Sequence, residues 1–126
     1  MKSGLEIQTI FIEVANMKNI KNTKYILFYN HGEDIYYCFK SMRSRKELIK
    51  DFNNKHEVVK YVFAIPCNKM FFLLDYGIYD GDYMALDDYL YNNAPNMTKA
   101  KMLVQYVRDH YGEILTDCED YLNESF

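Results

Sequence analysis

Apolar and polar residues alternate along several short stretches of the first half of the chain. The segment LEIQTIFIEV (5–14) alternates with a period of two, and KYILFYN (24–30) and EDIYYCFK (33–40) are rich in β-branched and aromatic residues. His31 and Gly32 lie between the last two segments, and glycine allows the positive φ of a tight turn. The pattern predicts a first strand followed by a β-hairpin.

A helix and two further strands are expected next. Ser44 followed by Glu47 is a capping box, which predicts a helix that ends near residues 53–54. HEVVKYVFAI (56–65) and KMFFLLDYG (69–77) are apolar segments around a turn that contains proline. We expect them to form two antiparallel strands.

The pattern becomes helical in the last third of the chain. A short helix is expected near 84–90, and a longer one begins at Asn96 or Thr98. The longer helix has an apolar stripe at three- and four-residue spacing, formed by Leu103, Val104, Val107, Tyr111, Ile114, Leu115, Cys118 and Leu122. Gly112 is a point where this helix can kink or divide.

The order β-β-β-α-β-β-α-α predicts a single α+β domain over residues 1–126, with an antiparallel sheet of about five strands packed against C-terminal helices. The chain has 126 residues, of which 49% are hydrophobic and 17% aromatic. This content is enough to bury a core and argues against disorder.

Cysteine usage and the length of the apolar runs indicate a cytoplasmic protein. Cys38, Cys67 and Cys118 form no CxxC pair, so we expect three reduced thiols in an intracellular protein. The longest apolar runs, YVFAI and MFFLL, are too short to span a bilayer, so no membrane association is expected. The heavy use of Asn, Lys, Ile, Tyr and Phe is typical of an AT-rich genome, that of a low-GC bacterium or a virus, and we expect the protein to come from a phage or mobile element.

Charge is distributed unevenly along the chain. The formal net charge is −3, but residues 1–70 carry +5 and residues 71–126 carry −8. The two halves could neutralise each other inside the fold. Alternatively, the surface is bipolar and presents an acidic face to a basic partner.

Catalytic, metal and nucleotide sites find little support in the sequence. The aspartates between Asp75 and Asp88 lack the spacing and the final Glu of a calcium loop. Asp87 and Asp88 are adjacent on a predicted helix and point about 100° apart, so they cannot form a facing acid–base pair. The five glycines form no phosphate-binding loop. We therefore expect no catalytic residues, no metal and no cofactor.

The segment LLDYGIYDGDYMALDDYLYNN (73–93) is the strongest candidate for a partner-binding surface. Tyrosine gives a large contact area at low entropic cost, and carboxylates complement the lysines and arginines of a partner. The candidate residues are Asp75, Tyr76, Tyr79, Asp80, Asp82, Tyr83, Asp87 and Asp88. We expect a non-enzymatic inhibitor or adaptor that mimics nucleic acid and engages a basic, nucleic-acid-handling protein.

Direct nucleic-acid binding is the first alternative. Basic residues interleaved with tyrosines can neutralise phosphates and stack on bases. The candidate residues for this function are Lys40, Arg43, Arg45 and Lys46. The pI of about 5.6 argues against it, because dedicated nucleic-acid binders are usually strongly basic.

A second alternative comes from a family resemblance. IYYCFKSM, a helix, HEVVKYVFAIPCNKMFFLLDY and GDYMALDDYL together resemble the small lobe and first large-lobe helices of a protein kinase, over about residues 24–110. By this resemblance, Lys40 matches the ATP-pairing lysine of the third strand. VANMKNI has no glycine in place of the Gly-rich loop, and no HRD or DFG motif follows. The resemblance therefore implies a catalytically dead relic of a kinase-like lobe.

Overall fold

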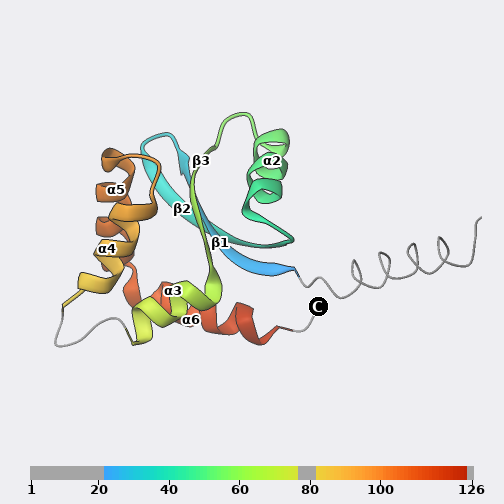
Figure 1. The fold of residues 1–126 in the computed structure, drawn as a ribbon. Helices are drawn as coiled ribbons and strands as arrows, with labels where there is room; N and C mark the ends of the chain where they lie inside the picture. The colour runs from blue at the N-terminus through green and yellow to red at the C-terminus, as the bar shows by residue number, and fades with distance from the viewer. Residues whose placement is uncertain (1–21, 77–81, 125–126) are drawn as a thin grey trace, which may run out of the picture.

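The computed structural model describes residues 22–76 and 82–124 (Figure 1). Its elements are β1 (Thr23–His31), β2 (Asp34–Met42), α2 (Arg45–Lys55), β3 (Lys60–Pro66), α3 (Cys67–Asp75), α4 (Met84–Asn93), α5 (Met97–Asp109) and α6 (Tyr111–Asn123). These described residues form an α+β fold with a three-stranded antiparallel sheet and five helices.

The sheet has the strand order β2-β1-β3, and both pairings are antiparallel. The predicted hairpin is confirmed: His31 pairs with Asp34, and Gly32 in the turn between them has a φ of 65°. A side chain at this φ would be strained, so glycine is the residue the turn needs. On the central strand, Phe28 lies opposite Tyr37 on one side and Phe63 on the other.

Helices cover both faces of the sheet. In Figure 1, α2 lies on one side of the strands, whereas α4 and α5 lie on the other. Alternate residues of β1 serve the two faces, as expected for a strand that is buried on both sides. Tyr25 and Leu27 belong to a small core under α2, whereas Ile26 and Phe28 belong to the main core with α3, α4, α5 and α6.

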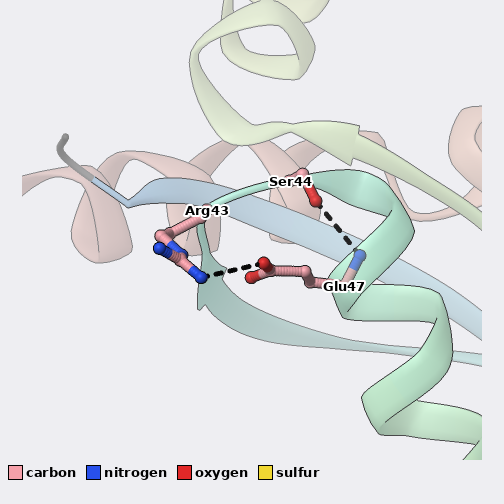
Figure 2. A network of polar contacts seen from close by, with 3 residues as sticks. All are labelled: Arg43, Ser44 and Glu47. Carbon is pink, nitrogen blue, oxygen red and sulfur yellow. Dashed lines mark hydrogen bonds and ion pairs between the residues drawn. The ribbon is translucent and has the colours of Figure 1, made fainter. Parts of the chain in front are cut away.

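The predicted start of α2 is confirmed by its cap (Figure 2). The Ser44 hydroxyl accepts a hydrogen bond from the backbone N–H of Glu47 at 3.1 Å. This bond satisfies one of the donors that a helix N-terminus leaves unpaired. The Glu47 carboxylate forms an ion pair with Arg43 at 3.1 Å, which further anchors the first turn to the end of β2.

The prediction of about five strands is wrong. Residues 69–77 were expected to form a strand, but α3 occupies Cys67–Asp75. Cys67, Met70 and Leu74 recur at helical spacing and are buried, so the main core selects the helix. The run MFFLL is apolar throughout, and periodicity alone cannot assign such a run to a strand or a helix.

Other boundaries also differ from the prediction. The strand expected at 5–14 lies outside the described residues. β3 begins at Lys60 and not at residue 56. The long C-terminal helix is divided at His110, which ends α5 and precedes α6. The division was expected at Gly112, two residues later.

The three cysteines differ in burial. Cys38 is half-buried, Cys67 and Cys118 are buried, and all three thiols are free. A hydrogen bond with Cys67, together with burial, raises the pKa of the Cys118 thiol. Among residues 22–76 and 82–124, no helix is both long enough and apolar enough to cross a membrane.

Candidate partner-binding surface

Helix α3 buries one side and exposes two aromatic rings on the other. Met70, Leu73 and Leu74 face the core. Phe72 and Tyr76 point outward, with 53% and 72% of their surface exposed, respectively. Their ring centroids are 5.5 Å apart, and the ring planes are tilted by 35°. Because the two residues are four positions apart on a helix, they form one continuous aromatic strip.

A lysine lies beside this strip and connects it to α4. The Lys69 ammonium lies 5.8 Å from the centroid of the Phe72 ring and 5.4 Å from that of Tyr89, within cation–π range of both. Asp75, the last residue of α3, is exposed next to Tyr76. We call this surface the α3 ridge; it comprises Lys69, Phe72, Asp75, Tyr76 and Tyr89.

Asp75 and Tyr76 were predicted from the sequence, but Lys69, Phe72 and Tyr89 were missed. A strand over 69–77 would place Phe72 on the same face as Leu74, so the strand prediction treats Phe72 as a core residue. A helical projection of residues 67–76 could have found it, because Cys67, Met70 and Leu74 fall on one face and leave Phe72 outside it.

Three of the predicted partner-binding residues hold α4 in place. The Asp82 carboxylate accepts a hydrogen bond from the backbone N–H of Met84 at 2.9 Å, just before the helix. Asp87 forms an ion pair with Arg108 of α5. The Arg108 guanidinium also lies 5.0 Å from the centroid of the Tyr83 ring. Arg108 thus joins α4 to α5, and the charge of Asp87 is partly neutralised within the fold.

The remaining candidates of this segment lie apart from that network. Asp88 is exposed on α4. Tyr79 and Asp80 lie outside the described residues. The structure therefore places Asp75 and Tyr76 beside Phe72 in the α3 ridge. Asp82, Tyr83 and Asp87 instead hold α4 in place.

The basic residues proposed for nucleic-acid binding are spread over different environments. Arg43 is paired with Glu47. The Arg45 guanidinium lies 5.3 Å from the centroid of the Phe63 ring and is half-buried. Lys40 is half-buried in β2, and Lys46 is exposed on α2. Two of the four arginine and lysine side chains are thus already engaged by groups of the same chain.

The described residues contain no group of three or more His, Cys, Asp or Glu side chains that could hold a metal ion. Open grooves occur at the edges of the fold, one lined by Met42, Glu47 and Lys50 and another by Glu33, Met102 and Asp109. Comparison of the chain with family models, curated proteins and solved structures found no match.

Proposed function

We propose that the protein is a small non-enzymatic inhibitor or adaptor, carried by a phage or mobile element, that binds a basic, nucleic-acid-handling protein. The α3 ridge is the centre of the contact. The observation that carries this proposal is the exposed aromatic pair Phe72 and Tyr76 beside the carboxylate of Asp75.

The aromatic pair favours a protein partner. Single exposed apolar side chains are normal on a protein surface, but adjacent exposed rings are typical of interaction sites. Phe72 and Tyr76 already contact each other at the end of α3, with their ring planes tilted by 35°, so little side-chain entropy is lost when a partner covers them. Aromatic residues of this kind contribute much of the binding energy of known interfaces.

The Asp75 carboxylate in the last turn of α3 favours a basic partner, whereas Lys69 lies in the first turn of the same helix. The last turn of α3 contains Asp75 and no basic residue. The C-terminal end of a helix carries partial negative charge, so an aspartate there disfavours the folded state by about 0.3–1 kcal/mol. A lysine or arginine from a partner would offset this repulsion and gain electrostatic attraction.

The same charges favour a protein partner over direct nucleic-acid binding. Phosphates would be repelled by the carboxylates of residues 71–126, which carry a net charge of −8. A protein that handles nucleic acid has a basic cleft, and a negative, aromatic surface can occupy such a cleft in place of the nucleic acid. A basic, nucleic-acid-handling protein therefore fits the proposed surface.

The proposal is tested by affinity capture from host lysate, followed by binding measurements with the protein recovered. We expect Tyr76→Ser and Phe72→Ser each to weaken binding by about tenfold or more. The matched control is Val58→Ser, because Val58 is also 72% exposed but precedes β3 and lies outside the ridge. Raising salt from about 0.1 M to about 0.5 M should weaken binding further.

Two other results would count against the proposed function. Binding that is unchanged in both ridge variants contradicts the proposed surface. A retarded oligonucleotide in a gel-shift assay, lost on changing Arg43, Arg45 and Lys46, would support the nucleic-acid alternative instead.

A further inference from the structure

The Lys69 ammonium lies over two rings of the α3 ridge, within the range of cation–π attraction. It lies between Phe72 and Tyr89, at 5.8 Å and 5.4 Å from the ring centroids. The side chain is exposed, so burial does not force it into this position. At such distances a ring face attracts an ammonium even where the side chain is exposed to solvent.

A second ring of the ridge has room for another cation. Tyr76 is 72% exposed and contacts Phe72 through one side of its ring. Asp75 and Tyr76 follow Phe72 by three and four positions, so both side chains neighbour Phe72 on the helix surface. One cationic side chain of a partner could therefore lie over the Tyr76 ring and pair with the Asp75 carboxylate at the same time.

We propose that the α3 ridge binds an arginine side chain of the partner protein, which stacks on Tyr76 and Phe72 and pairs with Asp75. This inference rests on the proposed function and names the chemistry of the central contact. Lys69 lies over Phe72 and Tyr89, so it competes with the incoming guanidinium for the Phe72 ring and repels its positive charge.

Arginine fits this surface better than lysine for two reasons. The guanidinium is planar and less strongly hydrated than an ammonium, so it loses less when it stacks on an exposed ring. Its several N–H groups can also donate to a carboxylate while the plane remains on the ring. The lysine ammonium is a compact, strongly hydrated charge with no plane to stack on the ring, so it gains less from the same surface.

The inference is tested with two short capped peptides, one of alternating arginine and glycine and one of alternating lysine and glycine, with equal charge. Titration of the full chain labelled on tyrosine and phenylalanine is followed by NMR, using the ring signals of Tyr76 and of Phe72; the Phe72 signals remain observable in a Tyr76 variant. We expect the arginine peptide to bind at least about threefold more tightly. Tyr76→Leu should abolish this preference, whereas Val58→Leu should leave it unchanged.

Lys69 provides an independent readout. Lys69→Gln should tighten binding of the arginine peptide by more than the control Lys101→Gln does, because both variants remove one positive charge but only Lys69 lies on the rings. Equal binding of the two peptides, or equal effects of the two lysine variants, would overturn the arginine assignment.

The peptide titration tests the arginine contact, and the capture experiment tests the proposed function, so the two proposals can be contradicted independently. If the ridge variants weaken binding of the captured protein but the peptides bind equally, the proposed function stands and the arginine contact is wrong. If the arginine preference holds but the captured protein binds the variants normally, the ridge is a cation site and the proposed function is wrong.

Discussion

The Tyr37 hydroxyl donates a hydrogen bond of 2.5 Å to the carboxylate of Asp117. The bond joins the edge strand β2 to α6, 80 positions later in the sequence. Tyr37 also makes edge-type ring contacts with Phe39 and Tyr106, so its ring packs against the main core while its hydroxyl reaches a charged group. This polar contact links α6 to the sheet, as do the hydrogen bonds from Lys24 to the carbonyl oxygens of Tyr121 and Leu122.

Tyr37→Phe should therefore destabilise the protein by about 1–2 kcal/mol, because a hydrogen bond to a charged group is lost while the ring is kept. Urea unfolding measures the change. A double-mutant cycle with Asp117→Ala isolates the bond, and we expect a coupling of about 1 kcal/mol. Additive effects of the two substitutions would show that the contact contributes nothing to stability.

Stability should fall at alkaline pH. Burial and the hydrogen bond with Asp117 raise the pKa of Tyr37 above its ordinary value of 10.0, and burial raises the pKa of Tyr29, Tyr61, Tyr106 and Tyr121. Above about pH 10 the unfolded chain loses these protons while the folded chain keeps them. The folded state is therefore stabilised fully below that pH and progressively less above it.

The contribution of Tyr37 can be measured separately. Between pH 10 and its raised pKa in the folded state, Tyr37 lowers the unfolding free energy by at most about 1.4 kcal/mol per pH unit, and solvent around its partly exposed ring reduces this figure. Tyr37→Phe should therefore make the alkaline decline shallower. Parallel pH profiles for wild type and Tyr37→Phe would contradict the shift.

The ion pair between Arg108 and Asp87 should matter more than the surface pair between Arg43 and Glu47. Asp87 is 21% exposed, and its Oδ1 is buried with no hydrogen-bond partner in the described structure. Arg108→Met leaves this carboxylate without its cation and removes the contact with the Tyr83 ring. Because the Arg108 side chain is 41% exposed, solvent screens the pair, and we expect a loss of about 1 kcal/mol.

Arg43→Met is the matched control, because both side chains of that pair are nearly half exposed. We expect a loss of less than about 0.5 kcal/mol for it in thermal or urea unfolding. Similar losses for the two variants would mean that Asp87 finds enough solvent to remain charged without Arg108.

Local signals in the sequence predicted the parts of the fold that local chemistry determines. The β-hairpin follows from Gly32, and the start of α2 follows from Ser44. The contacts that join distant segments, such as Lys24 with the carbonyl oxygens of Tyr121 and Leu122, have no local signal. The same limit applies to the candidate site.

The partner-binding surface depends on which residues face outward, and this depends on the type of element. Asp75 and Tyr76 are polar enough to be singled out by composition alone. Phe72 is chemically indistinguishable from a core residue until α3 is known to be a helix. Asp87 looks like a free surface charge until Arg108, 21 positions later, is placed beside it.

Substitutions at Phe72 and Leu74, two residues apart in α3, distinguish the helix from the strand that the sequence predicts there. In a strand, Phe72 and Leu74 share a face and should respond alike. In the helix, Leu74 is fully buried whereas Phe72 is about half exposed. We therefore expect Leu74→Ala to cost about 2–4 kcal/mol, because it leaves a cavity in the main core. Phe72→Ala should change the unfolding free energy by less than about 0.5 kcal/mol, because alanine is a good helix former. Equal and large losses at both positions in urea unfolding would contradict α3, and with it the exposed ring on which the α3 ridge depends.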